Sequence, residues 1–200
     1  MTAIIDYKAG NLTSVKYAFD ALGEESAITS DPDTIAAAGR VVFPGVGAAK
    51  SAMANLAGMG LVDAVRRAAA EKPFLGICLG MQILFDRSEE DGGVDCLGLV
   101  PGKVRRFPAG TPDKIPQIGW NDVERIDSSG KEREYYYFVH SYYAERGEFT
   151  AGVTKYAGVE ITSMVKKGNI LACQFHPEKS GRAGLKMIDD WLKGKECAAC

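Results

Sequence analysis

The sequence predicts an α/β fold with a doubly wound, mostly parallel central sheet, helices on both faces and a smaller antiparallel strand region in the second half. As far as residue 77, short apolar runs alternate with segments whose apolar residues recur at helical spacing. Beyond residue 100, strand-like runs lie between Gly, Pro, Asp and Ser residues. The 200 residues hold no repeat, low-complexity tract or linker, so we expect a single domain over 1–200.

The first half is expected to run β-α-β-α-β-α-β, which is the order of a parallel sheet covered by helices. Gly23 ends the first amphipathic segment, and Pro73 separates the last helix from a buried strand. The expected elements are strand 3–7, helix 12–22, strand 27–29, helix 32–38, strand 40–43, helix 61–70, strand 74–77 and a helix from 79 toward 85.

The second half is expected to be antiparallel, because its strand-like runs are short and are joined by turn residues. A last buried strand and a C-terminal helix complete the sheet. The expected elements are strands 100–107, 121–126, 135–143, 150–156, 161–166 and 170–175, followed by helix 183–192.

Composition excludes several classes of function. The net charge is -2 at pH 7 and Lys and Arg are scattered, which argues against nucleic-acid binding. No apolar stretch approaches the roughly 18 residues of a membrane span, and no leader pattern is visible, so we expect a cytoplasmic protein. Five irregularly spaced cysteines argue against a disulfide framework. Cys197 and Cys200 form a C-x-x-C, but we expect the tail after about residue 194 to be disordered and not a metal or redox site.

Cys78 lies between a predicted strand and a predicted helix, within Gly76-Ile77-Cys78-Leu79-Gly80. A nucleophile elbow has this strand-turn-helix setting, and flanking glycines keep side chains away from the sharp turn. The start of a helix also favours the reactive thiolate. The alternative is a small buried cysteine at an ordinary turn. The pattern therefore makes Cys78 a candidate nucleophile.

A thiolate needs a base and a group that orients the base. Only two histidines are present, and His176 follows the last buried strand with Glu178 two residues further on. In extended geometry these two side chains face the same side, and catalytic groups collect at the carboxyl ends of parallel strands. The alternative is a surface histidine before a helix that begins with Pro-Glu. The three residues together favour a catalytic triad.

An oxyanion intermediate needs preformed donors. The backbone N–H of Leu79 is one candidate, and the turn Pro44-Gly45-Val46-Gly47 can supply another from Val46 or Gly47. The alternative is a plain turn. Phosphate binding by this segment does not fit the dinucleotide or P-loop spacings.

The stretches around Cys78 and His176-Pro177-Glu178 resemble the class I (triad) glutamine amidotransferases. The chain is more similar still to the glutaminase subunit of imidazole glycerol phosphate synthase. Four further stretches support that resemblance: Ile5-Asp6-Tyr7 with Gly10-Asn11-Leu12, Pro44 to Gly47, Gly119-Trp120-Asn121, and Tyr137 to Tyr143. Lys8 and Gln117 depart from the family's usual residues.

The resemblance implies the class I glutamine amidotransferase fold and hydrolysis of L-glutamine to glutamate and ammonia, without cofactor or metal. Cys78 would be the nucleophile, His176 the base and then the acid, and Glu178 its orienter. The family passes ammonia to a TIM-barrel cyclase subunit in a heterodimer, and its glutaminases are poorly active without that partner. The resemblance places glutamine near Gly45, Gln82, His140, Ser141 and Tyr142, and places Asn11, Trp120 and Lys179 at the partner interface, where ordinary surface packing is the alternative.

Three other functions remain to be weighed. A different amidotransferase would share the triad and differ in its synthase partner. A free-standing cysteine hydrolase would act on glutamine, peptides or small amides alone, at ordinary rates. A non-catalytic assembly subunit would retain the fold, but the intact triad argues against it.

Overall fold

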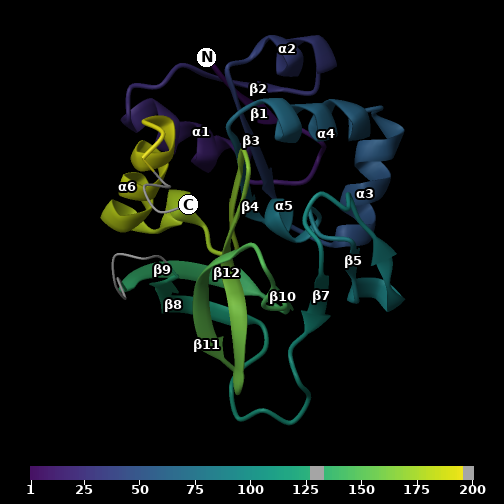
Figure 1. Cartoon of the computed structure of the whole chain (residues 1–200), viewed down its shortest axis with the longest axis vertical. Helices are drawn as coiled ribbons and strands as arrows, with labels where there is room; N and C mark the ends of the chain where they lie inside the picture. Colours follow the sequence, from purple (N-terminus) through teal and green to yellow (C-terminus); the bar gives the residue numbers. More distant parts are fainter. Residues whose placement is uncertain (127–132, 196–200) are drawn as a thin grey trace.

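A parallel sheet forms the half of the protein that carries the helices, in the strand order β2-β1-β3-β4-β13 (Figure 1). The computed structural model describes residues 1–126 and 133–195. Every neighbouring pair in this order is parallel. The strands are β1 (Thr2–Ile5), β2 (Ser26–Thr29), β3 (Arg40–Gly45), β4 (Phe74–Cys78) and β13 (Ile170–Cys173).

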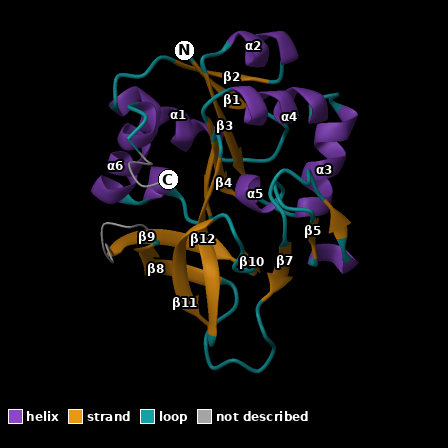
Figure 2. Ribbon diagram, viewed as in Figure 1, coloured by secondary structure: helices purple, strands orange, loops and turns teal. Residues whose placement is uncertain are grey.

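Helices cover both faces of this parallel sheet (Figure 2). Successive side chains of a strand point to opposite faces, so Ile4 packs with one helix layer while Ala3 and Ile5 pack with the other. The first layer holds α1 (Leu12–Ala21) and α6 (Gly181–Leu192), and the second holds α2 (Pro32–Ala37), α3 (Ala49–Gly58), α4 (Val62–Glu71) and α5 (Leu79–Gln82). This is the predicted doubly wound arrangement.

Strand β12 (Val159–Lys167) joins the parallel sheet to the antiparallel strands below it (Figure 1). Its last residues pair with β13, and most of its residues pair with β11 (Thr150–Tyr156) on the other edge. Strand β11 leads to β8 (Gln117–Arg125) and β9 (Arg133–His140). On its other side β12 leads to β10 (Tyr142–Ala144), β7 (Lys103–Arg106), β5 (Arg87–Ser88) and β6 (Val94–Asp95).

Two expected elements end earlier than the sequence predicts. The single strand 135–143 divides at Ser141, because β9 pairs with β8 whereas β10 pairs with β7. The helix beginning at Leu79 stops at Gln82. The carbonyls of Ile83 and Leu84 accept hydrogen bonds from residues 97–100, so they do not continue the helix.

Helix α3 was not predicted, although Ala49, Ala52 and Leu56 recur at helical spacing and are buried. The short strands β5 and β6 were also not predicted. Each has two residues, which is too short for an alternation pattern to be recognised.

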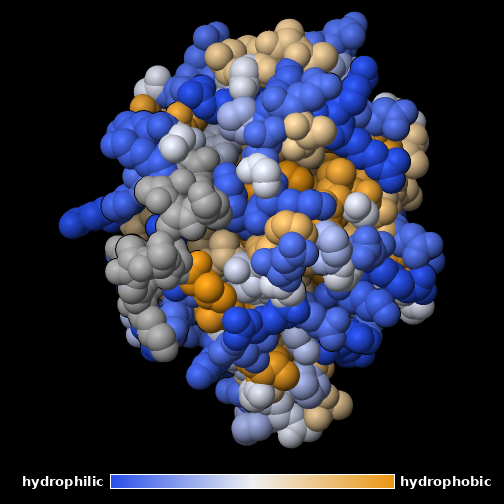
Figure 3. Space-filling view, in the orientation of Figure 1, coloured by the Kyte–Doolittle hydropathy of each residue, from blue (hydrophilic) through white to orange (hydrophobic). Residues whose placement is uncertain are grey.

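The surface on the face seen in Figure 1 is mostly hydrophilic, with hydrophobic groups interrupting it near the middle (Figure 3). None of the helices within 1–126 and 133–195 has both the length and the apolar character needed to cross a membrane. The predictions for the C-terminal tail, including Cys197 and Cys200, lie outside the described residues.

Candidate active site

Cys78 ends β4 in a sharply turned backbone, with φ of 54° and ψ of -114°. A positive φ is unusual for a residue with a side chain. Here this strained backbone conformation lies at the turn from β4 into α5. Its neighbours explain the flanking glycines. A Cβ on Gly80 would lie 1.9 Å from the Phe43 carbonyl oxygen, and one on Gly76 would lie 3.0 Å from the Ala172 side chain. Adjacent strands, more than the turn itself, therefore require glycine at these positions.

His176 and Glu178 contact each other, with Nδ1 and Oε1 separated by 2.7 Å. Both side chains are only 2% exposed. The expected extended geometry is wrong for Glu178. Strand β13 ends at Cys173, and Pro177–Lys179 forms a single turn of 3-10 helix that carries Glu178 back toward the imidazole. Proline favours the first position of such a turn, which is the physical reason for the difference.

The charges around His176 favour its protonated form. Burial opposes a charge on the imidazole, but the Cys78 thiolate and the Glu178 carboxylate outweigh it and raise the pKa of His176 to about 10. With Nδ1 held by Glu178, Nε2 is the nitrogen left for the reaction. It is buried and has no hydrogen-bond partner among the described residues. The site is therefore built for a proton at Nε2.

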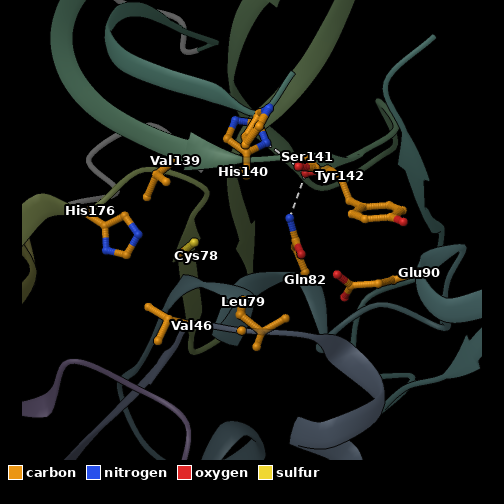
Figure 4. A pocket seen from close by; sticks show the side chains of 12 residues that line it. Val46, Cys78, Leu79, Gln82, Glu90, Val139, His140, Ser141, Tyr142 and His176 are labelled. Carbon is orange, nitrogen blue, oxygen red and sulfur yellow. Dashed lines mark hydrogen bonds between the residues drawn. The ribbon is translucent and has the colours of Figure 1, made fainter. Parts of the chain in front are cut away.

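Cys78 and His176 open into a pocket of about 360 Å³. Figure 4 shows the Cys78 sulfur between the His176 ring and the Gln82 side chain, with Glu90 beyond Gln82. The lining residues are Val46, Gly47, Cys78, Leu79, Gln82, Glu90, Pro116, Val139, His140, Ser141, Tyr142 and His176. A pocket of this volume with few convergent polar groups suits a small polar ligand.

Four of the five residues expected to bind the ligand line this pocket, namely Gln82, His140, Ser141 and Tyr142. The Tyr142 carbonyl accepts from Gln82 Nε2 and from His140 Nδ1, both at 2.8 Å (Figure 4). Burial lowers the pKa of His140 to about 4, so this ring is neutral. Gly45 is not among the lining residues, and a Cβ there would come within 2.2 Å of the Tyr7 hydroxyl.

The three oxyanion candidates lie beside Cys78. Leu79 is the first residue of α5, while Val46 and Gly47 follow the end of β3. The register places Gly45 opposite Cys78, which brings the turn after β3 to the elbow. Gly47 has a φ of +96°, a conformation that glycine adopts without strain.

Two polar side chains near Cys78 and the pocket were missed by the sequence reasoning. Glu90 Oε2 accepts from the Ala49 backbone N–H at 2.6 Å and thereby caps α3, and burial raises the pKa of its carboxyl group. Gln174 is fully buried and donates from Nε2 to the Cys78 sulfur at 3.8 Å. Glu90 carries no sequence signal. Gln174 could have been predicted to lie near Cys78, because residues two apart in an extended strand face the same side and Gln174 lies two residues before His176.

The expected interface residues all lie on the surface. Trp120 is 57% exposed and packs edge-on against Tyr137, whose carbonyl accepts from the His176 backbone N–H at 2.9 Å. Lys179 is exposed directly after Glu178. Asn11 is exposed and caps α1 through Ser14. Helix α1 packs beside the turn that carries Lys179 and Glu178.

Comparisons with known proteins identify the family of the chain. Residues 3–194 match the family described as glutamine amidotransferase class-I. The imidazole glycerol phosphate synthase subunit HisH of Methylococcus capsulatus is 48% identical, over 96% of this chain and 95% of that protein. The subunit of the same name from Methanothermobacter thermautotrophicus is 46% identical, over 96% and 98%. A solved structure of PurLQS from Thermotoga maritima has a TM-score of 0.74 at 16% identity, covering 96% of this chain and 97% of that one.

Proposed function

Because the chain belongs to the class-I glutamine amidotransferases, we propose that Cys78, His176 and Glu178 are the triad with which it hydrolyses glutamine. The chain is a glutaminase and a subunit of imidazole glycerol phosphate synthase, which serves histidine biosynthesis. The observation that carries the proposed triad is that Cys78 and His176 meet at one pocket, while Glu178 holds the His176 ring through Nδ1. Strand β4 supplies Cys78, the chain after β13 supplies His176, and the following turn supplies Glu178.

The triad geometry performs amide hydrolysis in two steps. The Cys78 thiolate attacks the side-chain carbonyl carbon of glutamine, and the C–N bond breaks as His176 gives a proton to the leaving nitrogen. Ammonia leaves, and a thioester joins the glutamyl group to Cys78. Water then attacks the thioester with His176 as base, which releases glutamate and restores the thiolate. Glu178 holds the ring through Nδ1 in both steps.

The pocket offers groups suited to an α-amino acid. Glu90 is the acidic side chain among the lining residues and can pair with the α-ammonium group of glutamine. Leu79, Val46 and Gly47 stand beside Cys78, where backbone N–H groups would meet the developing oxyanion. Gln82, His140, Ser141 and Tyr142 form the remaining polar wall, and Gly45 ends β3 directly before the turn.

The partner subunit is proposed to be a TIM-barrel cyclase that receives the ammonia. Exposed apolar residues on one face of β8 support a docking surface for this partner. Ile118 is 63% exposed and Trp120 is 57% exposed. Across the ribbon, Val139 lies opposite Ile118, and Val139 also lines the pocket. Contiguous apolar surface of this kind marks interaction sites. A partner seated there, and against Asn11 and Lys179, would cover the route by which ammonia leaves.

Glutamate release from glutamine tests the proposal, first with the purified chain and then with the cyclase and its nucleotide substrate. Strong stimulation by the loaded partner is expected. Cys78→Ala and His176→Ala should each abolish glutamine-dependent synthesis and leave ammonia-dependent synthesis intact. Full glutaminase activity in either variant would overturn the triad. Ordinary rates without any partner would point to a free-standing hydrolase.

A further inference from the structure

Gln174 is a buried side chain next to the nucleophile that the triad does not account for. It follows β13 and is 0% exposed. Its Nε2 lies 3.8 Å from the Cys78 sulfur, within the range of N–H···S hydrogen bonds, and its Oε1 accepts from Gln82 Nε2 at 2.9 Å. It is not among the residues that line the pocket. Gln174 therefore touches the reacting sulfur without contacting the space in which glutamine would bind.

The neighbouring amide fixes which end of Gln174 faces the sulfur. Gln82 Nε2 donates to the Tyr142 carbonyl as well as to Gln174, and a carbonyl oxygen can only accept. The nitrogen of Gln82 is thereby assigned, and Gln174 must present its oxygen to Gln82. Its NH₂ group then points at Cys78. The reverse orientation would set a carbonyl oxygen against the anionic sulfur and two NH₂ groups against each other.

We propose that Gln174 is a catalytic residue that donates a hydrogen bond to the Cys78 thiolate, with Gln82 as the residue that orients it. The proposal rests on the function proposed above, since it requires Cys78 to be the nucleophile. A donor to the charged form of a group favours that form, and the effect is strong where water is excluded. The same donor acts again when the thioester breaks, because the electron pair of the C–S bond then returns to the sulfur.

The test measures the pH dependence of Cys78 alkylation by iodoacetamide, with the rate in Cys78→Ala subtracted as the contribution of the other cysteines. Gln174→Met removes the donor at similar volume, and we expect the pH midpoint of alkylation to rise by about one unit. In the complex with the cyclase, kcat for glutamine should fall about tenfold at neutral pH, with KM within about twofold. A role in packing alone would not move the pH midpoint.

Gln117→Met is the matched control, because Gln117 is a glutamine of similar burial, 2% exposed, on β8. Its alkylation midpoint should equal that of the wild type. If Gln174→Met does not fold, Gln174→Leu repeats the test. An unshifted midpoint in the folded Gln174 variant refutes this inference while wild-type glutaminase activity stands. Absence of wild-type activity with the loaded partner would instead refute the proposed function.

Discussion

Replacing Gly80 by alanine should separate the nucleophile elbow from the turn that follows β3. A Cβ at this position would lie 1.9 Å from the Phe43 carbonyl oxygen and 2.9 Å from its carbon. Non-bonded atoms of this size pack at more than 3 Å, so the two backbones must part by roughly 1 Å. The Cβ would be fixed to the backbone of α5 and the carbonyl belongs to β3, so neither side can rotate away.

The cost follows from that displacement. Overpacking of a well-packed interior costs about 1–3 kcal/mol, and we expect the upper end because backbone must move. The register pairs Gly45 with Cys78, so the same shift moves the turn after β3, which holds the proposed oxyanion donors, relative to the Cys78 sulfur. A misplacement of about 1 Å can reduce a rate roughly 100-fold. Gly80→Ala should therefore lose about 3 kcal/mol of unfolding free energy and roughly 100-fold in glutaminase activity.

Urea unfolding of the chain and glutamine-dependent turnover of the complex measure the two effects. Gly58→Ala is the control, since a Cβ there has no atom within 4 Å and Gly58 lies in helix α3. It should raise the unfolding free energy by about 0.5–1 kcal/mol, because alanine is the better helix former, and should leave turnover unchanged. An unfolding free energy and turnover for Gly80→Ala equal to those of the wild type would show that the Cβ is accommodated without separating the two backbones.

Three further predictions concern groups outside the triad. The buried Tyr7 hydroxyl has no hydrogen-bond partner among the described residues, so Tyr7→Phe should leave the urea-unfolding free energy unchanged or raise it by about 1 kcal/mol; a clear loss would contradict this. The pKa of His140, ordinarily near 6.5, is about 4 in the fold, so its stabilising contribution is complete above pH 6.5 and is lost as pH falls toward 4. This fall in unfolding free energy is at most about 3 kcal/mol. The unfolding free energy of His140→Phe should not fall by this amount between pH 6.5 and 4. Trp120→Ala should weaken binding of the proposed cyclase partner by about 2 kcal/mol, roughly 30-fold in Kd by calorimetry, with an unchanged melting temperature because the residue is 57% exposed; equal affinity would remove it from the proposed interface.

The sequence predicted those parts of the proposed site that are marked by a short stretch of residues. The elbow around Cys78 is marked by its own glycines, and His176 with Glu178 is marked by residue type and spacing. The alternation of apolar runs gave the order of the parallel strands and helices, since burial on both faces leaves a continuous apolar run in each strand. These patterns can be recognised in the sequence within a few residues, although the close contacts that require the glycines come from adjacent strands.

Other features were decided only by which distant segments meet. The strand 135–143 breaks at Ser141 because its two halves pair with different strands, and that break puts His140 and Tyr142 at the pocket. Glu178 reaches His176 through a turn and not along an extended strand. Glu90 reaches the pocket while capping α3, a helix 41 residues earlier in the chain, and the hydrogen bond from Gln174 to Cys78 spans 96 residues. Sequence spacing determines contacts along one element, whereas strand pairing and packing bring distant elements together, so only the tertiary structure could place these groups around the sulfur.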